Sequence, residues 1–270
     1  MTRIDELYRN LLEKKVVTTR EVQRAVKGRT SGDMRKVYGI YIRRLLKGHK
    51  LVRIRRGLYA ALGPLEKPAD FIPDRFLVSS KVRSRGYIGF HTALEFYGAA
   101  HSANNNVYLA VSRRDKFRPF QFRGLTYMPV ISERLTAGIV AVDYSGSKPR
   151  VSSRERTFID CVDRVDHAGG WEECLLSLEA MGGADFGKLR ALLDEIGHDF
   201  LLRKAGLVLE TLRRASAYYA GVSEGLLKHI ESRIGSAPMY LDPKRPPSAL
   251  STRWRLYVPA DFQDILGGPP

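Results

Sequence analysis

The sequence has few cysteines and no long apolar run. Its 270 residues include two cysteines, Cys161 and Cys174, which lie in helical-looking segments and have no metal-ligand spacing. No apolar stretch approaches the roughly 20 residues that a membrane-spanning helix needs. Residues 1–6 are polar and periodic, unlike a signal peptide. We therefore expect reduced thiols, no membrane partner and a cytoplasmic protein.

Acidic residues are also scarce, and their distribution is informative. The chain has 29 Asp and Glu against 45 Lys and Arg, a net charge of +16. Residues 1–63 hold 17 basic and 5 acidic residues, whereas residues 64–270 hold 28 and 24. Charge that served only solubility would be spread more evenly. The N-terminal segment is therefore expected to bind a polyanion, with nucleic acid as the favoured partner.

The motifs of common enzyme classes are missing. Gly146-Ser147 could begin a nucleotidyltransferase loop, but the acidic pair that would hold two Mg²⁺ ions does not follow. The histidines have no zinc spacing, and there is no phosphate-binding loop or nucleophile elbow. Asp160, Asp163 and Asp166 fan out around a predicted helix, which favours a solvated face over a metal site. The sequence predicts no catalytic residue, metal or cofactor.

The first sixty residues have the pattern of three helices and a hairpin. Thr18 and Glu21 form a capping box that opens the second helix. Turn-forming residues at 27–33 precede a third helix, expected from Met34 to Lys47. Two β-prone runs in residues 51–60 then flank a basic turn. This order predicts a winged-helix DNA-binding domain over residues 1–62.

The third helix separates into two faces at 100° per residue. A glycine in a helix interior costs about 1 kcal/mol relative to alanine, so Gly39 needs a reason. Close approach of the helix to a major-groove wall is favoured; helix–helix contact or tolerated weakness stays open. The apolar face is Met34, Val37, Tyr38, Tyr41 and Leu45, and the opposite face is Lys36, Gly39, Arg43 and Lys47, with Arg35 at the border.

The basic residues of this segment divide into two expected roles. Hairpin arginines would contact phosphates or a narrow minor groove, and helix residues would read bases, since arginine pairs well with guanine. Any one of these cations could equally be a solvated side chain. The predicted DNA-binding residues are Arg35, Lys36, Gly39, Arg43, Lys47, Lys50, Arg53, Arg55 and Arg56.

A second basic cluster occupies residues 113–123, where phenylalanines alternate with cations. Basic and aromatic residues together can bind a single strand or RNA. An ordinary hairpin with one solvated and one buried face gives the same pattern and is favoured. The candidate residues for a second nucleic-acid or partner patch are Arg113, Arg114, Lys116, Arg118 and Arg123.

The rest of the chain predicts a larger mixed domain. Prolines and mixed charge mark residues 63–72 as a linker. Residues 73–270 are expected to form this C-terminal domain, so the fold class is α+β. Strands are expected near 86–90, 107–111 and 120–130, helices at 152–166, 171–181, 185–196, 199–213 and 223–234, and a last strand at 254–258 that returns to the sheet.

Several stretches, taken in order, suggest a family. They are Arg43–Gly48 with Leu51–Tyr59, Gly86–Gly98, Ser153–Asp160 with Gly169–Glu173, and Leu202–Glu210. Together they resemble AbiEi-like antitoxins, the transcriptional regulators of type IV toxin–antitoxin systems. The resemblance covers most of the chain.

The resemblance implies two activities. Family members repress their own operon by binding double-stranded DNA at inverted repeats, through the winged helix. Their C-terminal domain counteracts a nucleotidyltransferase toxin without a stable complex. Two alternatives remain open: a winged-helix transcription factor unrelated to toxin–antitoxin function, whose second domain binds an effector, and an RNA-binding protein or nucleic-acid enzyme.

Overall fold

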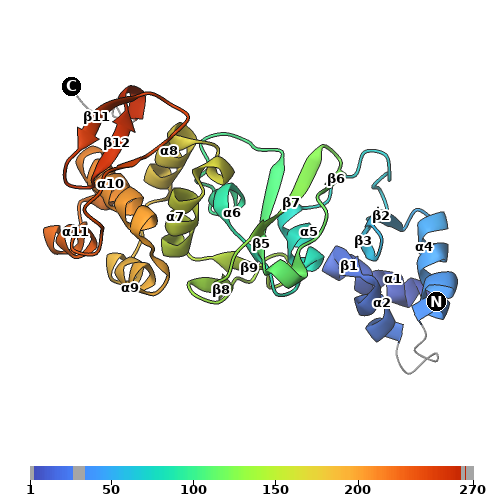
Figure 1. The fold of residues 1–270 in the computed structure, drawn as a ribbon. Helices are drawn as coiled ribbons and strands as arrows, with labels where there is room; N and C mark the ends of the chain where they lie inside the picture. Colours follow the sequence, from blue (N-terminus) through green and yellow to red (C-terminus); the bar gives the residue numbers. More distant parts are fainter. Residues whose placement is uncertain (1–2, 27–33, 263–264, 266–270) are drawn as a thin grey trace.

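The computed structural model describes residues 3–26, 34–262 and 265. Helices and strands are mixed along the chain, so the fold is α+β. Figure 1 shows three regions in a row: the N-terminal elements at one end, a sheet in the middle, and helices with a small sheet at the other end. None of the described helices is long and apolar enough to cross a membrane.

Residues 3–62 form one layer of helices on a three-stranded sheet. The sheet is antiparallel with the order β1-β3-β2. The predicted capping box is confirmed, because the Glu21 amide donates to Thr18 Oγ1 and the Thr18 amide donates to Glu21 Oε2. The elements are α1 (Arg3–Lys14), β1 (Val16–Thr18), α2 (Thr19–Val26), α3 (Met34–Val37), a π-helical turn (Tyr38–Ile42), α4 (Arg43–Lys47), β2 (Leu51–Arg55) and β3 (Leu58–Ala61).

A six-stranded mixed sheet lies at the centre. Its order is β6-β7-β5-β4-β9-β8, with parallel pairing of β5 with β7 and of β4 with β9. The helices α5 (Arg75–Val82) and α6 (Phe90–Phe96) accompany it. The strands are β4 (Tyr87–Ile88), β5 (Asn106–Val111), β6 (Phe120–Phe122), β7 (Leu125–Ile131), β8 (Ile139–Ala141) and β9 (Arg150–Ser152).

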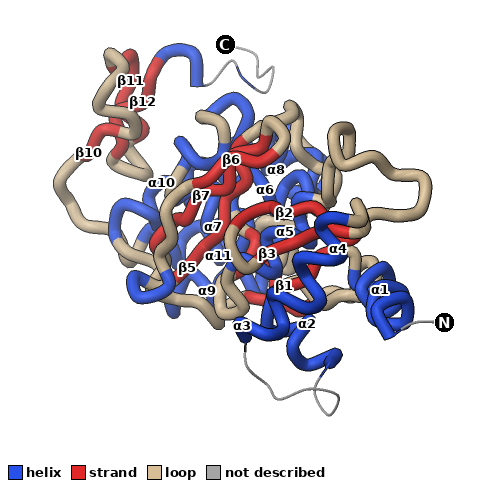
Figure 2. Tube along the Cα trace, turned by 90° about the vertical axis from the view of Figure 1, so that its right-hand side faces the viewer, coloured by secondary structure: helices blue, strands red, loops and turns tan. Residues whose placement is uncertain are grey.

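The N-terminal elements share a hydrophobic core with the central sheet. Val16, Ile54 and Leu58 belong to the same buried cluster as Leu77 of α5 and Val107 of β5. Figure 2 shows β1, β2 and β3 close to α5 and in front of the central strands. The predicted linker, residues 63–72, forms a loop between β3 and α5. This loop therefore joins two regions that pack on each other directly.

The region after residue 153 is mainly helical, as predicted, with bounds within a few residues of expectation. Its last strand does not return to the central sheet, so that prediction is wrong. Trp254 instead packs on Gly206 of α10 and donates to Glu210. The elements are α7 (Arg154–Asp163), α8 (Trp171–Met181), α9 (Phe186–Ile196), α10 (Asp199–Ala215), α11 (Glu224–Glu231) and a separate sheet of β10 (Met239–Tyr240), β12 (Leu256–Pro259) and β11 (Pro247–Ser251).

Candidate nucleic-acid interface

The helical run from Met34 to Lys47 carries cations on its outer side. Val37, Tyr41 and Leu45 are buried against the other N-terminal helices. Arg43 and Lys47 are exposed on the opposite side. This division agrees with the predicted faces at these positions, and it leaves a positively charged helix surface open to solvent. The other exposed residues of this surface are Lys36, Gly39, Ile40 and Arg44.

The middle of this run is a π-helical turn, which the sequence did not reveal. The Arg43 amide donates to the Tyr38 carbonyl, five residues earlier, so each residue of the turn advances less than 100° around the axis. The turn shifts the faces: Ile42 is fully buried, whereas Tyr38 is 40% exposed. The prediction that Tyr38 belongs to the buried face is therefore wrong. Turns of this kind occur often at functional sites.

Gly39 lies in this turn with open space around it. A Cβ atom built at this position has no neighbour within 4 Å. Contact with another helix of the described chain therefore does not explain the glycine. Of the two remaining explanations, close approach to an external partner and tolerated weakness, only the first concerns binding.

The hairpin of β2 and β3 brings two of its three arginines to the surface. Arg53 and Arg56 are exposed. Gly57 has a φ of +84°, which permits the tight turn, and its carbonyl accepts from the Thr19 amide at the start of α2. Arg55 is instead half-buried, with its guanidinium 4.6 Å from the ring centre of Phe120. The turn is thus fixed beside α2.

Two further predicted residues are placed differently. Lys50 pairs with Asp5 at 3.0 Å and lies over the ring of Tyr8, so part of its charge is used within the protein. Arg35 belongs to α3, but its side chain lies outside the described part of the structure.

The second basic cluster, residues 113–123, is not an aromatic platform. Phe117 is buried, and Phe120 stacks on Tyr127 with ring centres 4.8 Å apart. The rings therefore belong to the core and are not available to stack bases. The cations Arg113, Arg114, Lys116, Arg118 and Arg123 are exposed, and Arg123 donates to the Pro68 carbonyl. This is the arrangement of a hairpin with one buried face, the alternative that the sequence favoured.

The fold joins the two basic segments, which are about sixty positions apart. Arg55 of β2 lies 5.8 Å from the ring centre of Phe117, and Arg83 lies 5.4 Å from the same ring on its way out of α5. A groove of about 870 Å³ separates the hairpin and α2 from the end of α5 and the turn at Arg113–Asp115. Arg114 lines this groove, whereas Arg113 lines another cavity, of about 360 Å³.

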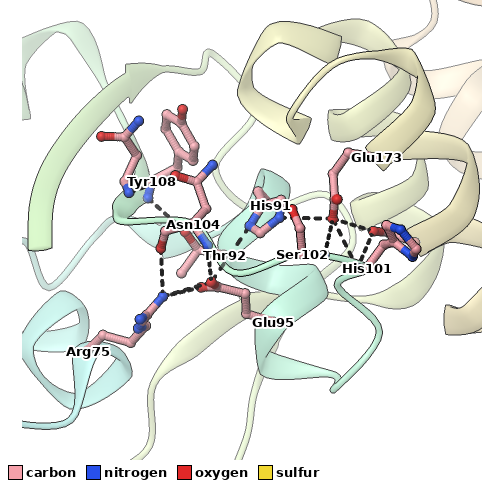
Figure 3. A network of polar contacts seen from close by, with 11 residues as sticks. Arg75, His91, Thr92, Glu95, His101, Ser102, Asn104, Tyr108 and Glu173 are labelled. Atoms are coloured by element: carbon pink, nitrogen blue, oxygen red, sulfur yellow. Dashed lines mark hydrogen bonds and ion pairs between the residues drawn. The ribbon is translucent and has the colours of Figure 1, made fainter.

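A buried polar network lies apart from these basic surfaces (Figure 3). His91 of α6 is fully buried between Glu173 of α8, at 3.1 Å, and Glu95, at 3.8 Å. Glu173 also accepts from the His101 and Ser102 amides. Burial opposes its ionisation, but the hydrogen bonds from Ser102 and Ser177 hold the pKa of Glu173 below its ordinary value. The network ties α6 and α8 together.

The predicted solvated stripe of aspartates on α7 is wrong at its first member. Asp160 is buried, accepts from Arg156 Nε at 2.8 Å, and receives the Tyr87 hydroxyl at 3.0 Å. Burial raises the pKa of Asp160 to about 6, against the effect of Arg156. Asp166 is exposed, as expected. Within the described residues, no group of His, Cys, Asp or Glu could hold a metal ion.

Several basic residues near the interface were not singled out from the sequence. Arg20 and Arg24 of α2 and Arg83 after α5 line the groove, and Arg44 is exposed on α4. The capping box placed Arg20 at the start of a helix, which was a usable signal. Arg83 could not have been found, because only tertiary packing brings α5 beside the hairpin.

Comparisons with known proteins give a fold and no family. No protein-family model matches the chain, and no curated protein matches it significantly. The fold is similar to the crystal structure of the RV2827C protein from Mycobacterium tuberculosis, with a TM-score of 0.62 and 14% sequence identity. The match covers 94% of this chain and 88% of that chain. At this identity the likeness concerns the fold alone.

Proposed function

We propose that this chain is a DNA-binding transcriptional repressor that works in the cytoplasm, and that residues 3–62 act as its winged helix. The order helix, strand, two helices and hairpin, with strand order β1-β3-β2, supports this reading. One observation carries it: Arg43 and Lys47 are exposed opposite buried Tyr41 and Leu45, on a helix that leads directly into a basic hairpin.

The proposed docking follows from the shape of the helix. A run of fourteen residues is about 21 Å long, and a major groove about 12 Å wide admits a helix. Arg43 and Lys47 would reach base edges, and Ile40, which is 42% exposed, could contact a thymine methyl group. Arg53 and Arg56 of the hairpin would contact phosphates.

We further propose that the chain is the antitoxin of a type IV toxin–antitoxin system. The support is the sequence resemblance described above. In this proposal residues 73–270 counteract a nucleotidyltransferase-type toxin without forming a stable complex. The operator would be an inverted repeat upstream of the operon, which two copies of the chain would occupy.

Two assays test these proposals separately. A labelled duplex of the chain's own upstream region is titrated against the full-length protein, beside a scrambled duplex of equal length. Preference for the upstream duplex by about a thousandfold or more is expected of a specific regulator. Equal binding to both duplexes would overturn the repressor proposal.

The second assay is co-expression with the nucleotidyltransferase-like protein encoded next to the chain. Growth restored by the wild type and by an Arg43→Ala/Lys47→Ala variant is expected, because antitoxicity is assigned to the C-terminal region. If the wild type does not restore growth, the antitoxin proposal fails, and a repressor unrelated to toxins is the better reading.

A further inference from the structure

The groove between the hairpin and the central sheet is strongly basic. Its walls are the start of α2, the hairpin turn, the end of α5 and the short turn at Arg113–Asp115. Only two acidic residues, Glu21 and Asp115, line it. The basic residues lining it are Arg20, Arg24, Arg55, Arg56, Lys81, Arg83 and Arg114.

The two acidic residues do not neutralise the arginines. Glu21 pairs with Lys81 at 2.5 Å. Burial opposes its ionisation, but the hydrogen bonds from Lys81 and Thr18 hold the pKa of Glu21 below its usual range. Asp115 accepts from the Ser112 hydroxyl. Among the described residues, no carboxylate pairs with an arginine of the groove, so the groove holds a surplus of positive charge.

Arg55 and Arg83 share this surplus at the inner wall. Both guanidinium groups lie within 6 Å of the ring centre of Phe117. Arg55 Nη1 is buried and has no hydrogen-bond partner among the described residues. Burial and the neighbouring charge of Arg83 lower the pKa of Arg55. Two like charges held this close are stabilised when an anion lies beside them.

The character of the lining narrows the class of ligand. Single-stranded nucleic acid binds by stacking its bases on exposed rings, but Phe117 is buried and Phe120 is covered by Arg55. Small-molecule pockets are mostly apolar, and this groove is open and polar. Arginines without accessible rings are suited to phosphates of a duplex backbone, which they contact without reading sequence.

We propose that this groove binds the sugar–phosphate backbone of duplex DNA next to the segment contacted by α4 and the hairpin. The central region of the protein would thus extend the DNA interface beyond the winged helix, through Arg83 and Arg114. The hairpin turn, Arg55–Gly57, belongs to both surfaces and makes them continuous. This inference rests on the proposed function.

Neighbouring residues provide a matched test. Arg114 and Arg113 are both exposed, but Arg114 lines the groove and Arg113 lines the other cavity. The Arg114→Ala and Arg113→Ala variants lose the same charge from the same turn. Each is titrated with the upstream duplex and the scrambled duplex at several salt concentrations, and thermal unfolding is measured to establish that each variant is folded.

For Arg114→Ala, the slope of log K against log salt is expected to become shallower by about 0.9, the value for one phosphate contact. An Arg83→Gln/Arg114→Ala variant is expected to lose about twice as much. Affinity for both duplexes should fall by the same factor, so the preference for the upstream duplex is kept. Arg113→Ala should retain the wild-type slope.

The outcomes separate this inference from the proposed function. If the wild type binds DNA through α4 but both groove variants keep its slope, the groove inference is wrong and the winged-helix proposal stands. If Arg113→Ala changes the slope as much as Arg114→Ala, the effect is general charge and the inference is also wrong. If the wild type does not bind duplex DNA, both proposals fail together.

Discussion

Gly39→Ala is expected to change stability and DNA affinity in opposite directions. A Cβ at Gly39 has no neighbour within 4 Å, so the methyl group fits without any shift of the protein. Alanine is favoured over glycine in a helix by up to about 1 kcal/mol. For a chain of this size, that gain raises the melting temperature by about 2–4 °C.

The same methyl group faces the proposed DNA surface. If the helix backbone approaches a groove wall closely at Gly39, the methyl group would push it away and weaken neighbouring contacts. A loss of about 1.4 kcal/mol corresponds to a tenfold weaker complex, and we expect a loss of this order. Thermal unfolding measures the first effect, and titration of the upstream duplex by fluorescence anisotropy measures the second.

Gly225→Ala is the matched control, because Gly225 is an exposed helical glycine in α11 where a Cβ makes only ordinary contact. It should leave DNA affinity unchanged. If Gly39→Ala binds DNA as tightly as the wild type, close approach of this helix position to DNA is refuted, and tolerated weakness is the explanation of the glycine.

Two further predictions concern the fold. Gly206→Ala would place a methyl group inside the ring of Trp254, so we expect destabilisation by about 1–3 kcal/mol in urea unfolding; wild-type stability would contradict the packing described. Glu173→Gln weakens the charged hydrogen bonds from His91 and Ser177, at a cost of about 1–3 kcal/mol. Because the folded pKa of Glu173 is lowered, its contribution is present above the unfolded value of about 4.3 and is lost as the pH falls through the folded value. Urea unfolding between pH 3 and 7 should therefore show a smaller acid-induced loss in the variant; equal losses would contradict this role.

Local signals in the sequence identified most elements but not their arrangement. The capping box at Thr18 and the periodic helices after residue 153 depend on near neighbours, and the structure has them. A second capping box, expected at Thr92, is absent: α6 begins at Phe90, and the Thr92 hydroxyl accepts from the Tyr108 amide of β5. There a tertiary contact replaced a local one.

The candidate site shows the same limit. A helical wheel with a constant advance predicted buried Val37, Tyr41 and Leu45 correctly, but it could not foresee the π-helical turn that exposes Tyr38. Nor could it foresee that Arg55 would turn inward onto phenylalanines of a distant segment. Both results depend on packing between elements that no sequence window contains together.

The most direct test of the central claim compares DNA binding by two charge-matched variants. Arg43→Ala/Lys47→Ala removes two exposed cations from α4, and Lys188→Ala/Lys228→Ala removes two from α9 and α11, at the far end of the molecule (Figure 1). Removing a side chain that reads a base costs about 1–3 kcal/mol, so the α4 variant should bind the upstream duplex at least about tenfold more weakly and lose its preference over scrambled DNA. The distal variant should keep both properties. If the two variants bind alike, or if the wild type shows no preference, the helix from Met34 to Lys47 does not read DNA.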